Sequence, residues 1–249
     1  MNPISFVYQE ILFRPLFNLM VGIAAFLPNH SVAVSIILVT ILVRLILLPF
    51  SIHQAKHMQK NQQKMADLKG ELKKINDTHK DNPTEKNKAT MELYRKAGVN
   101  PVAGCLPLLI QLPVLIAIYR VFLNGIGPEN WHFLYSFVPH PDALHVFFFG
   151  INITTPNIML AILAGIGQFF QVRMMSSTQP QVGSDDESAK MMAAMQKNMN
   201  YIFPALTVFI ALRLPAALPL YWLVSTIFAI GQQYFLKRWL KVSLNTPVM

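Results

Sequence analysis

Long apolar stretches separated by shorter polar segments dominate the chain. Five of them meet or approach the roughly 20 mostly apolar residues that a membrane-spanning helix needs. They cover residues 31–50, 102–123, 158–175, 202–212 with a methionine-rich lead-in, and 216–236. The pattern predicts an all-α, polytopic membrane protein with five transmembrane helices, the first of which belongs to a segment that extends to residue 52.

The first 30 residues follow a different pattern. Between residues 7 and 27 the apolar sequence is interrupted by Glu10, Arg14 and Asn18, whose spacing of four places them in one stripe of a helix. Such a stripe favours an amphipathic helix that lies in the outer membrane interface. A sixth membrane crossing is the alternative, because residues 22–27 are apolar all round.

Residues 53–99 are strongly polar and carry 11 Lys or Arg and 6 Asp or Glu. Apolar residues still recur there at helical spacing, which indicates two amphipathic helices that pack on each other. The first apolar face consists of Met58, Met65, Leu68, Leu72 and Ile75, and the second of Ala89, Leu93, Tyr94 and Ala97. Turn-forming residues at 81–84 separate the two faces. We therefore predict a helical hairpin over residues 53–99.

The composition agrees with a membrane protein. Hydrophobic residues make up 53% of the chain and charged residues only 13%, whereas a soluble domain carries about 25% charge. The formal net charge of +9 would suggest a nucleic-acid partner in a soluble protein, but the polar insert alone contributes +5. Because basic loops mark the cytoplasmic side of a membrane protein, we predict no nucleic-acid specificity.

The distribution of charge also orients the chain. Residues 124–155 contain no Lys or Arg, whereas the hairpin and the short C-terminal tail are basic. The hairpin, the loop 176–190 and the C-terminus are therefore expected in the cytoplasm, and the loop 124–155 and the N-terminus outside. Arg120 and Arg213 then lie near outer helix ends, where we expect them to reach the lipid headgroups.

Arg44 is the most informative single residue. Its guanidinium stays charged and lies well inside an apolar span, which costs about 2.5 to 3.5 kcal/mol on insertion scales. One alternative is that Arg44 reaches the interface or pairs with a buried acid. No Asp or Glu lies within any of the other predicted spans, however. We therefore expect Arg44 to be a functional residue that faces a hydrated cavity.

Other polar residues in the spans are candidates for lining that cavity, although each of them can equally join helices by hydrogen bonds. They are Thr40, Gln111, Gln168, Gln171, Ser225, Thr226, Gln232 and Gln233. Gly165 and Gly167 indicate close helix packing. Motifs for zinc proteases, serine hydrolases and P-loop nucleotidases are absent. We therefore predict no enzymatic activity, no cofactor and no metal site.

Four stretches resemble the YidC family of membrane protein insertases. They are the arginine-bearing span 41–49, residues 94–101, the stretch 104–113 that follows, and residues 214–222. The resemblance covers nearly all of residues 9–240. The stretch from Asn100-Pro101 to Gln111-Leu112-Pro113, combined with an intramembrane arginine, is specific for this family.

The resemblance implies a five-span core with an amphipathic outer helix, a cytoplasmic hairpin and a hydrophilic groove. The groove is expected to open to the cytoplasm and to lipid and to be closed to the outside. Arg44 matches the family's groove arginine, and Trp222 together with Gln171 or Gln168 matches positions that face the groove. The candidate groove residues are Arg44, Thr40, Gln111, Gln168, Gln171 and Trp222.

The implied function is a membrane protein insertase and chaperone. It would accept hydrophobic segments of nascent membrane proteins and release them laterally into the bilayer without ATP. The bacterial plasma membrane is the expected location, in a short form that lacks the large external domain of some relatives. The ribosome and the Sec translocon are candidate partners.

Two other functions stay open at this point. A small anion channel or transporter would use Arg44 as its selectivity charge. A chaperone for membrane proteins that are already inserted would share the groove. An insertase differs from a channel in an external seal, which we expect in the apolar outer halves of two spans, residues 35–41 and 115–121.

Overall fold

The computed structural model describes residues 6, 8–80, 82–100, 106–124, 126–139, 141, 143–176 and 187–244. Most of these residues are helical, so the expected all-α class is confirmed. The α-helices are α2 (Arg14–Phe26), α3 (Val32–Ile46), α4 (Leu48–Asp67), α5 (Lys69–Thr78), α6 (Pro83–Lys96), α7 (Leu106–Asn124), α8 (Ile158–Ser176), α9 (Glu187–Ala211) and α10 (Ala217–Leu244). The short elements are η1 (Gln9–Phe13), η2 (Pro28–His30), η4 (Pro128–Phe133), β1 (Phe147–Phe148) and β2 (Ile151–Asn152).

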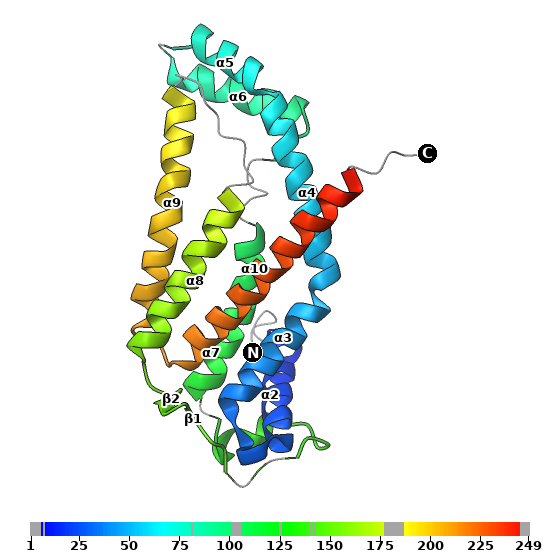
Figure 1. Cartoon of the computed structure of the whole chain (residues 1–249), viewed down its shortest axis with the longest axis vertical. Helices are drawn as coiled ribbons and strands as arrows, with labels where there is room; N and C mark the ends of the chain where they lie inside the picture. Colours follow the sequence, from blue (N-terminus) through cyan, green and yellow to red (C-terminus); the bar gives the residue numbers. More distant parts are fainter. Residues whose placement is uncertain are drawn as a thin grey trace.

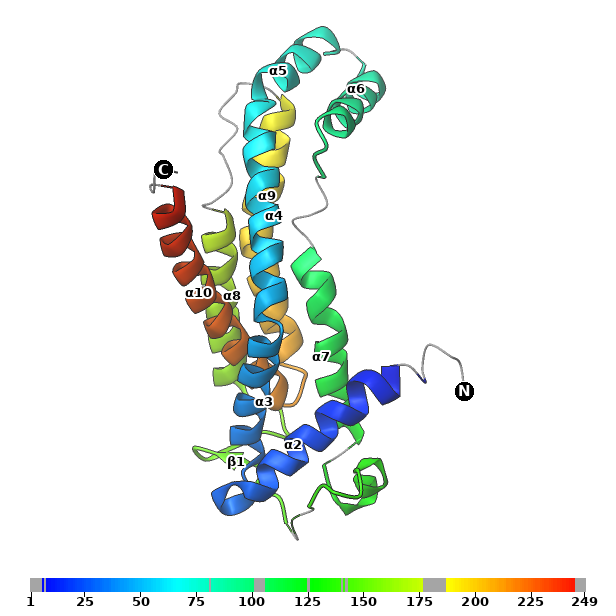
Figure 2. The same ribbon diagram turned by 90° about the vertical axis from the view of Figure 1, so that its right-hand side faces the viewer.

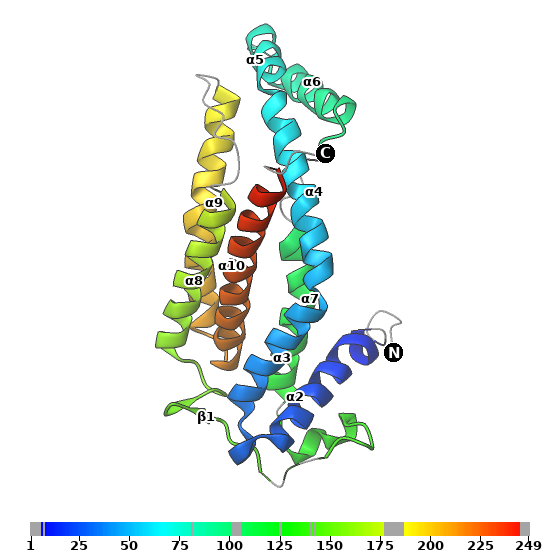
Figure 3. The same ribbon diagram turned by 45° about the vertical axis from the view of Figure 1, so that its right-hand side comes forward.

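The long helices form an elongated bundle (Figure 1). Helix α10 packs against α3 on one side and α8 on the other, and α8 packs in turn against α9. Helix α2 crosses the lower ends of α3 and α7 obliquely (Figure 2). Helices α5 and α6 lie at the opposite end of the molecule (Figure 3). The bundle therefore has two distinct ends, one capped by α2 and the 126–157 connection and the other by α5 and α6.

The helices differ in how far their length and apolar character suit a membrane crossing. Over the described residues, no individual helix is both long and apolar enough to cross one, whereas α3 and α4 together pass by length and composition. Shorter apolar stretches occupy Leu112–Phe122, Ile158–Met174 and Asn200–Ala211. The count of five crossings stays a prediction.

A bend of 58° separates α3 from α4. Pro49 lies in the first turn of α4, where it has no N–H to donate to the Leu45 carbonyl and its ring crowds that carbonyl. The straight helix α3 therefore ends at Ile46, and α4 begins at Leu48. The boundary at residues 52 and 53 between the first span and the hairpin stays a prediction.

The predicted hairpin consists of three helices instead of two. Its first arm breaks at Leu68 into α4 and α5, and the expected turn precedes α6, where Asn82 accepts a hydrogen bond from the Glu85 N–H (3.2 Å). The side-chain amide of Asn61 on α4 donates a hydrogen bond to the Asn100 carbonyl oxygen (2.8 Å) and accepts one from the Asn100 N–H (3.0 Å). This contact fixes the end of the hairpin against its beginning.

The polar stripe of α2 faces protein. Arg14 donates to the Glu10 carboxylate and to the Phe133 carbonyl oxygen (3.1 Å each). The buried Asn18 donates to the same carbonyl oxygen (2.9 Å) and accepts a hydrogen bond from the Tyr135 N–H. The stripe thus fastens residues 133–135 to α2, a role that its spacing did not predict.

The two arginines expected at outer helix ends lie over aromatic rings. The Arg120 guanidinium is 5.0 Å from the centroid of Tyr8, and that of Arg213 is 4.0 Å from the centroid of Phe209. Guanidinium groups are attracted to the negative face of an aromatic ring. These contacts give both charges an aromatic partner, and their position at the outer membrane surface stays a prediction.

Hydrogen bonds from the 143–157 segment join the lower ends of α3 and α10. The Val32 N–H donates to the His145 carbonyl oxygen (3.0 Å), and the N–H groups of Ala216 and Ala217 donate to the carbonyl oxygens of Thr155 and Ile153 (2.9 Å each). The first N–H groups of a helix have no partner within it. The loop therefore satisfies the start of α10 while it closes the lower end of the bundle.

Glycines on α8 permit the close helix packing that the sequence indicated. A Cβ atom at Gly165 would stand 2.2 Å from the Val208 side chain of α9, and one at Gly167 would stand 3.2 Å from Thr226 of α10. Valine on a helix has one strongly preferred rotamer, so Val208 cannot easily move aside. Both positions confirm the close-packing interpretation.

Gly165→Ala should therefore destabilise the protein. Forcing a methyl group into a packed interface typically costs about 1 to 3 kcal/mol. Gly231→Ala on α10 is the matched control, since its Cβ meets nothing within 4 Å, and alanine stabilises a helix by about 0.5 to 1 kcal/mol relative to glycine. Thermal unfolding of both variants in detergent measures the difference, and equal midpoints would contradict the packing.

Candidate functional site

Arg44 lies in the last turn of α3 and reaches across to α10. Its Nε atom donates a hydrogen bond to the Ser225 hydroxyl oxygen (3.0 Å), and a terminal N–H group donates to the same oxygen. Ser225 is buried, whereas Arg44 is half-buried. The charge is therefore held in place by a neutral acceptor on the neighbouring helix.

A second hydrogen bond joins the same pair of segments farther up. The Gln232 amide on α10 donates to the Ser51 hydroxyl oxygen on α4 (2.8 Å). In both cross-helix bonds the partners are 181 residues apart, so the α3–α4 segment and α10 run parallel in a fixed register. Seven residues separate the two bonds on each side, which is about 10 Å along a helix.

A cleft of about 480 Å³ lies between α4 and α10 next to this second bond. Its lining is apolar except for one amide. The lining residues are Leu48 and Ile52 of α4 and Phe228, Gly231, Gln232, Phe235 and Leu236 of α10. This volume falls within the range of sites that hold an apolar ligand or side-chain cluster.

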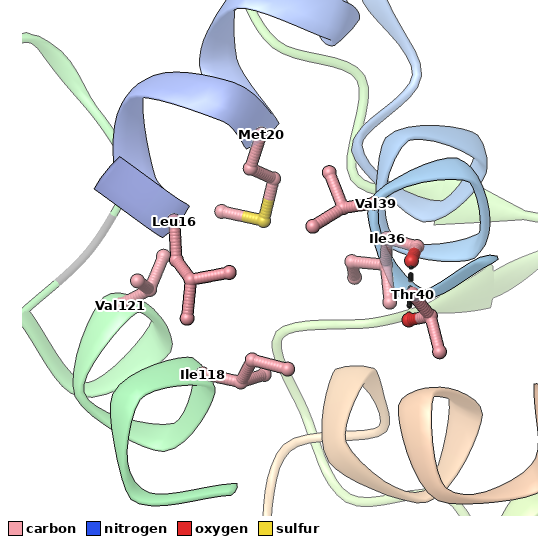
Figure 4. Close-up of a pocket in the computed structure, with 7 residues that line it drawn as sticks. All are labelled: Leu16, Met20, Ile36, Val39, Thr40, Ile118 and Val121. Atoms are coloured by element: carbon pink, nitrogen blue, oxygen red, sulfur yellow. Dashed lines mark hydrogen bonds between the residues drawn. The ribbon is translucent and has the colours of Figure 1, made fainter. Parts of the chain in front are cut away.

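Below Arg44 the bundle is closed by apolar packing. Figure 4 shows a void of about 10 Å³ there, lined by Leu16 and Met20 of α2, Ile36, Val39 and Thr40 of α3, and Ile118 and Val121 of α7. The one polar group, the Thr40 hydroxyl, already donates to the Ile36 carbonyl oxygen (2.6 Å). A water molecule needs more room and more polar partners than this void offers, so we expect it to be dry.

Exposed apolar side chains become more frequent above the level of Arg44, although Leu38 and Leu42 of α3 are also exposed below it. On the lower side, buried residues include Ile36 and Val39 of α3 and Leu220 and Tyr221 of α10. On the upper side, exposed residues are Leu45 and Ile46 of α3 and Ile227, Tyr234 and Phe235 of α10. Arg44 and Ser225 therefore lie at the boundary between a tightly packed half and an open half of the bundle.

The candidate groove residues fall into three groups. Arg44 stands at the boundary with Ser225, while Thr40 lies one turn lower in the apolar layer. Gln168 and Gln171 are half-buried on α8, and Trp222 is half-buried on α10. The side chain of Gln111 lies outside the described residues. Across those residues, no three His, Cys, Asp or Glu side chains gather as a metal site would require.

Ser225 and Gln232 form hydrogen bonds between helices, which is the role that the sequence favoured for each of the polar residues taken alone. The sequence offered no reason to prefer these two over Thr226 or Gln233. What distinguishes Ser225 and Gln232 is that each lies opposite a polar partner, Arg44 and Ser51, on the neighbouring helices. That arrangement follows from the packing of α10 on α3 and α4, which is not local in sequence.

Comparison with known proteins gives a consistent result. The model of the 60Kd inner membrane protein family matches residues 23–243. A protein of Fusobacterium nucleatum named membrane protein insertase YidC is 37% identical over 90% of the chain and 97% of its own length. A protein of Clostridium tetani with the same name is 32% identical, over 85% of the chain and 84% of its own length.

Some similar proteins are much longer. The protein of Chloroherpeton thalassium named membrane protein insertase YidC is 34% identical over 93% of the chain, but the match covers only 36% of its own length. The chain thus spans nearly the whole of some relatives and about a third of others.

Removal of the Ser225 hydroxyl tests the geometry of the site. Ser225→Ala takes away the acceptor of a charged donor and should lower the free energy of unfolding by about 1.5 to 3 kcal/mol. Ser51→Ala breaks a neutral hydrogen bond and should cost about 0.5 to 1.5 kcal/mol. Denaturant titration in detergent micelles measures both values.

The double variant serves as the control for independence. Two sites about 10 Å apart with no shared partner should have additive effects to within about 0.5 kcal/mol. A Ser225→Ala variant as stable as the parent, or less affected than Ser51→Ala, would contradict the assigned role of the serine.

Proposed function

The chain belongs to the YidC family of membrane protein insertases, and we propose that its α3, α4 and α10 helices form the groove that receives a substrate. Nascent membrane proteins are the substrates that this function implies. In the proposed mechanism Arg44 holds the polar, translocated segment of the substrate, while the hydrophobic segment passes along the open half of the bundle into lipid. The position of Arg44, fixed by Ser225 directly above a closed apolar layer, is the observation that carries the proposal.

The proposed topology has five membrane crossings, formed by α3 with the start of α4, α7, α8, α9 and α10. Exposed apolar side chains along α8 and α10 support contact with lipid. The hairpin with α5 and α6 would then lie in the cytoplasm, and the 126–157 connection outside, as the distribution of Lys and Arg indicates. In this orientation the closed half faces outward and the open half faces the cytoplasm.

The energetics make a role for Arg44 plausible without ATP. Bringing an aspartate to the centre of the bilayer costs about 2.5 to 3.5 kcal/mol on insertion scales. A carboxylate about 4 Å from a guanidinium gains about 4 kcal/mol where the effective dielectric constant is near 20. Since the two terms are of similar size, a charge in a half-hydrated groove can offset most of the barrier.

The apolar layer below Arg44 supports lateral release rather than conduction. Its residues on α3 and α7 fall within the ranges 35–41 and 115–121, in which the sequence predicted an external seal. A substrate segment held at Arg44 has no hydrated path outward through this layer and an open side toward lipid. An insertase needs this arrangement, because it must move a segment into the bilayer while excluding ions.

The other candidate residues have proposed roles that depend on their position. Gln168, Gln171 and Trp222 would provide polar or amphipathic contacts for the substrate from α8 and α10, and Gln111 would do so from α7. Thr40 would mark the floor of the groove. The ribosome and the Sec translocon are proposed partners, for which the basic cytoplasmic surface is the candidate contact.

The alternative function is a small anion channel or transporter that uses Arg44 as a selectivity charge. Such a protein requires a hydrated path through the layer that contains Ile36, Val39 and Ile118, and the small, apolar void in that layer disfavours one. Anion currents through the purified protein in liposomes would favour the channel over the insertase.

Neutralising Arg44 should abolish most insertion activity. For a small substrate with an acidic translocated segment, Arg44→Ala should slow insertion into proteoliposomes at least about tenfold, which corresponds to a loss of about 1.4 kcal/mol at the barrier. Arg44→Lys keeps the positive charge and should retain most of the activity. Protease protection of the translocated segment measures the rate.

Arg213→Ala is the matched control, because it removes the same charge at an exposed position at the lower end of the bundle. It should insert the substrate at nearly the parental rate. An Arg44→Ala protein that is folded and inserts as fast as this control would overturn the proposed role of the groove charge.

A further inference from the structure

The loop between β1 and β2 exposes aromatic side chains. The strands pair Phe147 with Asn152 and Phe148 with Ile151, so that Phe149 and Gly150 form a two-residue turn. Phe148 packs against the core, whereas Phe149 is 91% exposed and Phe147 is 50% exposed. Phe26 at the end of α2 is 83% exposed. We refer to Phe26, Phe147 and Phe149 as the aromatic tip.

Hydrogen bonds hold these three residues at one end of the molecule. The His145 N–H donates to the His30 carbonyl oxygen (3.1 Å), and the Val32 N–H donates to the His145 carbonyl oxygen (3.0 Å). The β-hairpin is therefore fastened to the turn between α2 and α3, four residues after Phe26. These hydrogen bonds hold the β-hairpin in the position in which Phe147 and Phe149 are exposed.

The backbone conformation of the turn is unfavourable for a phenylalanine. Phe149 and Gly150 both have positive φ angles, of 47° and 78°. A two-residue turn of this kind favours Asn-Gly or Asp-Gly, and a bulky residue at positive φ is uncommon. The sequence thus places a large apolar side chain in a strained position at the most exposed point of the hairpin. Strain of this kind points to a function for the residue that occupies it.

The segment that carries Phe147 and Phe149 is uncharged and leads along the chain into an apolar helix. Residues 143–157 contain no Asp, Glu, Lys or Arg. In all three views the hairpin lies beside the lower end of α8 (Figures 1, 2 and 3). The exposed residues of α8 include Ile158, Met159, Ile162 and Ile166. Phe147 and Phe149 therefore lie shortly before the exposed apolar start of α8 in the chain, at the same end of the bundle.

We infer that the aromatic tip inserts into the outer leaflet of the lipid bilayer and anchors the external connection to the membrane. The inference rests on the proposed crossing of the membrane by α8. Exposed apolar patches mark membrane or protein contact sites. The short connection to the exposed apolar start of α8 and the absence of charge in residues 143–157 favour lipid over a protein partner. Anchoring of this hairpin would also steady the loop that joins the starts of α3 and α10.

Spin labels in lipid vesicles test this inference on the full chain. The native Cys105 is replaced by serine, and single cysteines are introduced as Phe149→Cys, Phe147→Cys, Ile162→Cys on α8 and Asn87→Cys on the exposed surface of α6. Each is labelled with a nitroxide in vesicles of phosphatidylethanolamine and phosphatidylglycerol. Collision with oxygen reports lipid, and collision with a water-soluble nickel complex reports water.

We expect the labels at 149 and 147 to resemble the label at 162, with a ratio of oxygen to nickel accessibility several-fold above that at 87. Labels at 149 and 147 that resemble 87, with 162 in lipid, would overturn the inference and leave the proposed topology intact. A label at 162 in water would overturn the crossing by α8 as well. Because Phe149 is almost fully exposed, its replacement removes no core contact.

Discussion

A guanidinium that cannot lose its charge, placed within an apolar helix, is the constraint on which the account of this protein depends. Arg44 must keep a polar environment, and the hydroxyl of Ser225 provides part of it across the interface with α10. A neutral acceptor holds the position of the charge without cancelling it. Because a hydroxyl carries no negative charge, this contact leaves the positive charge of the guanidinium in place.

The rest of the bundle is arranged around the level of this charge. Below it, the α2 helix, the loop from β2 to α8 and the starts of α3 and α10 are joined by backbone hydrogen bonds and close packing. Above it, α4 bends away at Pro49 and leaves the cleft beside α10. One end is thus built for closure and the other for access. In the proposed function, this asymmetry would let the protein present a polar group within the bilayer without making a pore.

Local sequence patterns predicted most of the helices, but they could not predict the contacts between segments that are distant in the sequence. Arg44 could be recognised because a lone charge in an apolar run is a local signal, and the glycines of α8 were recognised in the same way. Ser225 could not be distinguished from its polar neighbours, since its role comes from the register between α3 and α10. Pro49 was visible in the sequence, but the continuous apolar run hid the bend that it causes.

The outer connection shows a second limit. Its lack of Lys and Arg predicted an external loop, yet the run from Phe147 to Phe149 was not interpreted as a strand and turn. Strand signals of two residues are too short to detect by periodicity. The polar stripe of α2 was identified correctly as a stripe, but its partners are backbone groups some 115 residues away in the chain, and spacing within one helix gives no information about them.

The central claim is that Arg44 acts on the polar segment of the substrate through its charge. The most direct measurement uses two substrates that differ only in having Asp or Asn at one translocated position. Each substrate is inserted by the parental protein and by Arg44→Ala, and the four insertion rates are compared. The account predicts coupling: Arg44→Ala slows the Asp substrate at least about tenfold and the Asn substrate only slightly. Equal slowing of both substrates would contradict it, since the arginine would then contribute to the protein without recognising the charge that it is proposed to receive.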